Sequence, residues 1–255
     1  MIKFCALSDL HGNLIDYIEP CDVVLIAGDI FPLDIQSNIL KSAEWFCQKF
    51  IPWAESLPCF RVIFTAGNHD FLFENLSEKE IMDILPLKVV YLEDEIYNYH
   101  GAKIYGTPWC TNLKKWAFYT KDETEFDDIP ECDILISHQP PMEGSVGTVH
   151  QPGYNYMKTF ASENLANNIK KVKPKYALSG HVHTGNHVPD MIDEIIYVNV
   201  SILDEDYKIK YYPFYFMYDT ENSSLNMKLK NLPKDPIKLK EEKPEDNNLY
   251  DKILP

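Results

Sequence analysis

Five short clusters of metal-binding residue types recur along the chain, and each follows a segment that is typical of a buried strand. The clusters are Asp9-x-His11, Gly28-Asp29, Gly67-Asn68-His69-Asp70, His138 and Gly180-His181-x-His183. The first four follow runs of apolar and β-branched residues, and the fifth follows the shorter segment Tyr176-Ala177-Leu178-Ser179. Because the carboxyl ends of successive strands meet at one edge of a sheet, we expect these side chains to converge. The pattern predicts a two-metal centre.

Carboxylate, imidazole and amide groups make up the predicted ligand set. Asp9 and His11 are alternate residues, so in extended backbone they face the same side and can bind one ion. The two oxygens of Asp29 can bridge two cations. The neutral ligands would be Asn68, His138, His181 and His183. This set suits Mn, Fe, Zn, Co or Ni better than Ca²⁺. Two ions about 3.5–4 Å apart would turn a bridging water into a hydroxide nucleophile and stabilise charge on phosphoryl oxygens.

Three polar residues are adjacent to the predicted ligands without being among them. His69 directly follows a ligand, so we expect its side chain to point toward substrate, where it could protonate the leaving oxygen. Asp70 could orient His69, and a buried capping role is the alternative. Asn13 lies two residues beyond His11 and could donate to a phosphate oxygen, with loop or helix capping as the alternative.

The composition limits the classes of partner. The chain of 255 residues has 24 basic and 39 acidic residues, a net charge of −15, and Arg61 is its only arginine. A protein that binds long nucleic acid normally carries a basic surface, so we expect no such partner. The six cysteines show no CxxC spacing, which is typical of a reduced, cytoplasmic protein. With no apolar run near about 18 residues, we expect no membrane partner.

The remaining pattern predicts a single α/β domain over residues 1–231. Helical spacing of apolar residues marks 35–53 and 160–172, and Ser77 with Glu80 predicts a capping box. The expected strands are 2–7, 22–27, 61–65, 88–91, 133–137, 176–179, 194–200 and 211–218, with a hairpin over 96–105. We expect a short helical or irregular connection over 13–19, an irregular segment over 107–130 and a loop over 142–157. Residues 232–255 are rich in Lys, Glu and Pro, which predicts a separate C-terminal tail.

The motif set resembles that of the calcineurin-like metallophosphoesterase superfamily over roughly residues 1–200. The resemblance implies a four-layer α/β/β/α sandwich with a dinuclear site at the top of the central sheets. It implies one metal on Asp9, His11, Asp29 and His183, and another on Asp29, Asn68, His138 and His181. His69 matches the non-ligand catalytic histidine of the family.

Further segments resemble class III cyclic nucleotide phosphodiesterases and the metallophosphoesterase-domain proteins of animals. These segments are Ile104-Tyr105-Gly106-Thr107-Pro108-Trp109, His138-Gln139-Pro140-Pro141 and Val198-Asn199-Val200-Ser201. Some members of that subgroup replace the first His of the GHxH motif by Gly and are weak enzymes. This chain keeps His181, so we expect a competent second metal site. The segment after Asp29 lacks the Val-Asp-Arg-Gly of protein Ser/Thr phosphatases, which argues against that activity.

The leading hypothesis is a phosphodiesterase that uses two divalent ions, Mn²⁺ foremost, to hydrolyse small phosphodiesters such as cyclic nucleotides. A nuclease or a phosphomonoesterase with the same ligand set is the first alternative. A non-catalytic binding scaffold is the second, and the full ligand set argues against it. The oligomeric state is left open, a homodimer included.

Overall fold

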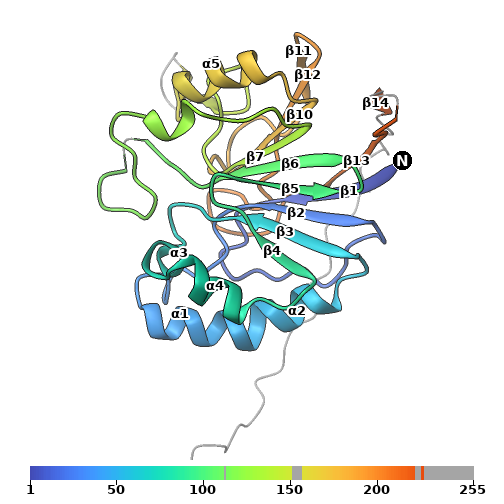
Figure 1. The fold of residues 1–255 in the computed structure, drawn as a ribbon. Coiled ribbons are helices and arrows are strands. Elements are labelled where there is room, and N and C mark those ends of the chain that lie inside the picture. Colours follow the sequence, from blue (N-terminus) through green and yellow to red (C-terminus); the bar gives the residue numbers. More distant parts are fainter. Residues whose placement is uncertain (112, 151–156, 222–224, 227–255) are drawn as a thin grey trace, which may run out of the picture.

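Two mixed β-sheets stacked face to face form the centre of the computed structural model, which describes residues 1–221 and 225–226 except 112 and 151–156 (Figure 1). The first sheet has the order β14-β13-β1-β2-β3-β4 and the second has the order β11-β12-β10-β7-β6-β5. The predicted tail at 232–255 lies outside the described residues.

Each sheet contains four successive parallel strands, which antiparallel strands extend on one side in the first sheet and on both sides in the second. The strands of the first sheet are β1 (Ile2–Leu7), β2 (Val23–Ala27), β3 (Arg61–Thr65), β4 (Val89–Tyr91), β13 (Phe214–Tyr218) and β14 (Leu225–Asn226). Those of the second are β5 (Glu95–Tyr99), β6 (Ala102–Thr107), β7 (Ile134–Ser137), β10 (Tyr176–Ser179), β11 (Asp190–Ile192) and β12 (Ile195–Asn199).

Helices cover the two outer faces of the sheets (Figure 1). The first sheet is covered by α1 (Ile39–Trp45), a π-helical turn (Phe46–Phe50), α2 (Ile51–Ser56), α3 (Phe71–Asn75) and α4 (Glu78–Ile84). The second sheet is covered by α5 (Glu163–Val172), and a 3₁₀ turn spans Thr124–Phe126. One apolar core lies between the sheets and one lies beneath each helical layer. This arrangement confirms the four-layer α/β/β/α fold.

Local capping signals account for the starts of two helices. Asn38 caps α1 by accepting from the Lys41 N–H, so this helix begins at Ile39 rather than at residue 35. Ser77 and Glu80 form the predicted capping box of α4.

One loop prediction needs correction, and a second connection takes the irregular one of its two predicted forms. The expected loop over 142–157 contains β8 (Thr148–His150), which pairs with β9 (Met157–Thr159). The connection over 13–19 has no helix, and the structure keeps it irregular. In both places the outcome depends on a neighbouring segment, which hydrophobic spacing does not report.

Candidate metal centre

The predicted ligands all lie just beyond the carboxyl ends of central strands. Asp9 and His11 follow β1, and Asp29 follows β2. The ligands from the other strands are Asn68 after β3, His138 after β7, and His181 and His183 after β10. The two sheets therefore both contribute to one site, as the strand-end pattern predicts.

The backbone is sharply turned at several of these positions. Asp9, His11, Asp29 and His181 have φ values of 55°, 41°, 57° and 69°, in the left-handed region. Such values cost energy in residues other than glycine and concentrate at functional sites. Gly28 precedes Asp29 with φ of +87°, and a Cβ atom there would lie 2.6 Å from His138 Nδ1. Glycine is therefore required where the β2 loop passes His138.

Three predicted ligands form the first half of the cluster: Asp9, His11 and His183, whose donor atoms lie within 4.8 Å of one another. His183 Nε2 is 3.3 Å from Asp9 Oδ1, and its Nδ1 lies 3.1 Å from the backbone oxygen of Asp204. A proton on Nδ1, donated to Asp204, leaves Nε2 free to bind a cation beside Asp9.

The second half of the cluster comprises Asn68, His138 and His181. His138 Nδ1 donates to the backbone oxygen of Ala27 at 2.8 Å, and its Nε2 is 3.0 Å from Asn68 Oδ1. Asp29 lies between the halves, with Oδ2 at 3.2 Å from His138 Nε2 and 3.4 Å from His11 Nε2. This is the placement that a ligand shared by two ions requires.

Burial and the carboxylates set the protonation of the cluster. Burial opposes the charged form of Asp29, but the neighbouring His138, His69 and His11 together outweigh it and lower the pKa of this carboxyl well below its usual range. Burial also opposes the charged form of His138, but Asp29 raises the pKa of His138 to about 9. Burial lowers the pKa of His11 and of His181 to about 4 each. The metal-free cluster thus holds a charged Asp29–His138 pair beside two neutral imidazoles.

The residues present fit two divalent cations. Both ring nitrogens of His11 are buried without a hydrogen-bond partner among the described residues, which is costly unless another group supplies one. A cation between His11, Asp9 and Asp29 would satisfy the unpartnered Nε2 atom and offset the two carboxylates. Oxygen and imidazole donors of this kind suit Mn, Fe, Zn, Co or Ni.

His69 lies beside the cluster and its side chain is partly accessible. Its Nε2 is 3.9 Å from Asp29 Oδ2, and 12% of the side chain is exposed. Its ring contacts His11 edge-on, with ring centroids 4.6 Å apart. The ring of Trp116 covers it, with ring centroids 4.4 Å apart. Nδ1 makes a hydrogen bond with Gln36 Oε1, which places the proton of the neutral ring on Nδ1. The other ring nitrogen, Nε2, then faces the cluster. This arrangement allows His69 to act on a bound substrate.

Asp70 contacts backbone groups rather than His69. Its Oδ2 accepts from the N–H groups of Asp29 and Gly67 at 2.8 Å, and Oδ1 accepts from that of Ile30 at 2.8 Å. Gln36, not Asp70, holds His69 Nδ1. We therefore correct the catalytic assignment of Asp70 and assign it the buried role that the sequence left open. It ties the β2 and β3 loops together.

Asn13 also differs from its functional interpretation. Its Nδ2 donates to the backbone oxygen of Leu10 at 2.9 Å, and its N–H donates to the same oxygen at 2.7 Å. These bonds close the turn that holds His11. The structure therefore supports the alternative loop role of Asn13.

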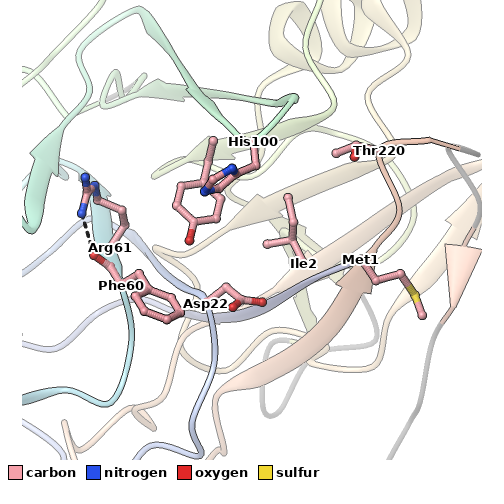
Figure 2. Close-up of a pocket in the computed structure, with 8 residues that line it drawn as sticks. Met1, Ile2, Asp22, Phe60, Arg61, His100 and Thr220 are labelled. Atoms are coloured by element: carbon pink, nitrogen blue, oxygen red, sulfur yellow. Dashed lines mark hydrogen bonds between the residues drawn. The ribbon is translucent and has the colours of Figure 1, made fainter.

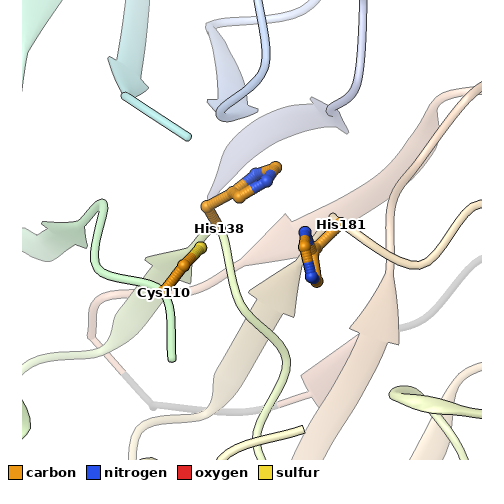
Figure 3. A group of neighbouring side chains, drawn as sticks. All are labelled: Cys110, His138 and His181. Carbon is orange, nitrogen blue, oxygen red and sulfur yellow. The ribbon is translucent and has the colours of Figure 1, made fainter. Parts of the chain in front are cut away.

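Three residues near the cluster escaped the sequence analysis because no ligand motif contains them. Gln36 reaches His69 from the segment before α1. Tyr207 has φ of 59° and presents its ring edge-on to His11 at 5.0 Å and to His183 at 5.1 Å. Cys110 lies beside His138 and His181 (Figure 3). Of the three, only Tyr207 follows a distinctive local pattern, the acidic run Asp204-Glu205-Asp206.

A pocket of about 540 Å³ lies at the opposite, amino ends of the strands (Figure 2). Its lining includes Arg61, His100 and the exposed ring of Phe60. Arg61 donates to Tyr97 and to the backbone oxygen of Phe60. The only arginine is therefore remote from the metal-ligand cluster, so phosphate recognition there must use other groups.

Among the described residues, we find no helix with the length and apolar character needed to cross a membrane.

Comparison with known proteins agrees with this geometry. A profile of the family described as calcineurin-like phosphoesterase matches residues 2–185. The chain is 29% identical over 240 residues to a UPF0046 protein of Caenorhabditis elegans, covering 84% of this chain and 80% of that protein. It is 28% identical over 235 residues to human metallophosphoesterase domain-containing protein 1, covering 81% of this chain and 68% of that protein. The solved structure of TT1561 from Thermus thermophilus shares the fold, with a TM-score of 0.50, 14% identity and coverage of 78% and 88%.

Proposed function

Because the chain belongs to the calcineurin-like phosphoesterase family, we propose that it is a dinuclear metal-dependent phosphodiesterase that hydrolyses small phosphodiesters such as cyclic nucleotides. The convergence of both sheets on Asp29 carries this proposal. His11 and His138 approach the same carboxylate oxygen from opposite halves of the cluster, at 3.4 and 3.2 Å. Two divalent ions bound there would supply an activated water and neutralise charge on the phosphoryl oxygens.

His69 is the proposed proton donor. Gln36 Oε1 accepts the Nδ1 proton, so only the imidazolium form of His69 carries a second proton on Nε2, which faces the cluster and is the proton given to substrate. Burial lowers the pKa of the free ring, and the negative charge of a bound phosphodiester would favour the imidazolium. Trp116 covers its ring and limits rotation and access of water. In this position His69 can stabilise the phosphoryl group and give the Nε2 proton to the oxygen that leaves.

Two aromatic rings favour a small substrate with a planar group. Trp116 lies on the His69 side of the cluster and Tyr207 lies over His11 and His183. Rings of this kind can stack a nucleobase. The net charge of −15 opposes long nucleic acid, and the only arginine is at the other end of the strands.

The remaining assignments complete this proposal. We take Mn²⁺ as the first ion to test, since the oxygen and imidazole donors accept it. The six cysteines are all free, which supports the reducing cytoplasm as the compartment. The proposed partner is the phosphodiester substrate, with a homodimer as the oligomeric state to test.

A substrate panel on metal-defined protein tests the activity. Mn²⁺-loaded enzyme should hydrolyse 2′,3′- or 3′,5′-cyclic nucleotides and bis-p-nitrophenyl phosphate faster than p-nitrophenyl phosphate or single-stranded DNA. Preference for the monoester or for DNA would instead favour the alternative activities. Absence of both metal and turnover would favour a binding scaffold.

The His69→Ala variant tests the proton donor. We expect kcat to fall by about 10²–10⁴-fold, the usual contribution of a positioned acid, with the metal content unchanged. His100→Ala, in an exposed turn at the opposite end of the strands, is the matched control and should keep full activity. Unchanged turnover in His69→Ala would overturn the assigned role.

A further inference from the structure

Cys110 is a buried thiol at the edge of the second half of the cluster. It follows β6, is 0% exposed, and its sulfur lies within 4.8 Å of ring nitrogens of His138 and His181 (Figure 3). The thiol thus adjoins two of the three residues of that half, His138 and His181.

The backbone holds Cys110 in this place. Its N–H donates to the Phe118 oxygen at 2.8 Å, and its carbonyl accepts from the Thr120 N–H at 2.9 Å. The Ala117 N–H donates to the Asn68 oxygen at 3.1 Å, which ties the same segment to the second half. By contrast, the thiol itself donates to the Pro108 oxygen at 3.8 Å, which is a weak contact.

The surroundings of Cys110 differ from those of the other buried cysteines. Cys5 and Cys21 belong to the apolar core beneath α1–α4, and Cys132 belongs to the core beneath α5. None of the three apolar cores includes Cys110. The position is suited to a cation rather than to packing alone.

We propose that Cys110 is a sulfur ligand of the second metal ion. This inference rests on the proposed two-metal function. The sulfur binds the ion beside His138 and His181 as a thiolate, and its proton passes to solvent buffer. A thiolate favours Zn²⁺, Co²⁺ or Fe²⁺ over the harder Mn²⁺. The first half has only carboxylate and imidazole donors. The two positions of the centre should therefore prefer different metal ions.

X-ray absorption at the zinc edge of the wild-type, zinc-loaded protein tests the ligand directly. We expect one sulfur scatterer at about 2.3 Å for every two zinc ions, besides nitrogen and oxygen at about 2.0–2.2 Å. Two bound zinc ions with only nitrogen and oxygen scatterers would overturn the Cys110 assignment and leave the phosphodiesterase proposal intact. Failure to bind any divalent ion would overturn both.

A matched pair of variants tests the metal preference. Cys110→Ser should lower the ratio of zinc to manganese affinity at the weaker-bound position by at least about tenfold, and it should abolish the sulfur-to-metal charge-transfer absorption of the Co²⁺ protein. Cys132→Ser removes another buried thiol, from the core beneath α5, and should change neither measurement. An unchanged ratio and spectrum in Cys110→Ser would contradict the proposal.

Discussion

The two halves of the metal-ligand cluster differ in how far protein groups already satisfy their imidazoles. In the second half, His138 is held by Ala27 on one ring nitrogen and by Asn68 and Asp29 on the other. In the first half, both ring nitrogens of His11 are buried without a hydrogen bond among the described residues. The second half is therefore preformed without metal, whereas the first half carries an uncompensated desolvation cost.

The contrast indicates which half should gain most stability from a bound metal ion. An ion in the first half would give His11 the partner it lacks, so binding there should stabilise the fold most strongly. An ion in the second half must compete with the hydrogen bonds that His138 already makes. Metal removal should consequently affect the two halves unequally, and substitutions can measure this.

The largest expected effect comes from a matched pair of substitutions in the metal-free protein. His138→Leu removes one partner of a buried charged pair and should lower the free energy of unfolding by about 3 kcal/mol. His11→Leu removes an unsatisfied ring of similar volume and should change it by less than about 1 kcal/mol. Urea unfolding in the presence of a chelator measures both, and equal losses would contradict the comparison.

The pH dependence of the same metal-free variants sharpens the comparison. The folded pKa of His11 is about 4, below the ordinary 6.5, so its contribution to stability is present above pH 6.5 and is lost as pH falls toward 4. The folded pKa of His138 is about 9, so its contribution is present below pH 6.5 and is lost as pH rises toward 9.

Each variant should therefore flatten one limb of the stability curve. Relative to wild type, His11→Leu should lose pH dependence between about 4 and 6.5, and His138→Leu between about 6.5 and 9, by an amount on the order of 3 kcal/mol each. The midpoints of urea unfolding, measured across this pH range, give the pH dependence of the free energy of unfolding for each variant. If the two variants differed from wild type in the same pH range, the assigned protonation states would be wrong.

The smallest expected effect concerns the ring over the first half. Tyr207→Ala should raise KM for a cyclic nucleotide about three- to tenfold with little change in kcat, because an aromatic contact contributes roughly 1 kcal/mol. Tyr207→Phe keeps the ring and is the control. Steady-state kinetics compare them, and an equal rise in KM for both variants would assign the effect to the hydroxyl group instead of the ring.

The fold and the strand-end motifs could be predicted because their signals are local. Apolar runs mark β1, β2, β3 and β7, and each strand ends one to three residues before its first metal-binding residue type. The capping box at Ser77 and Glu80 is local in the same sense. Asp70 shows the limit of such reasoning, since its partners at Ile30 and Asp29 are about forty residues away in the chain.

Short segments of the chain encode which carboxylate, imidazole and amide groups the strands bring to one edge, because residue alternation and strand order can be read from local patterns. Tertiary structure decided what surrounds them. Gln36 reaches His69, Cys110 reaches His138, and Tyr207 reaches His11 only because loops from distant segments pack across the same edge. Loop paths depend on long-range contacts, so no spacing rule could place these three side chains.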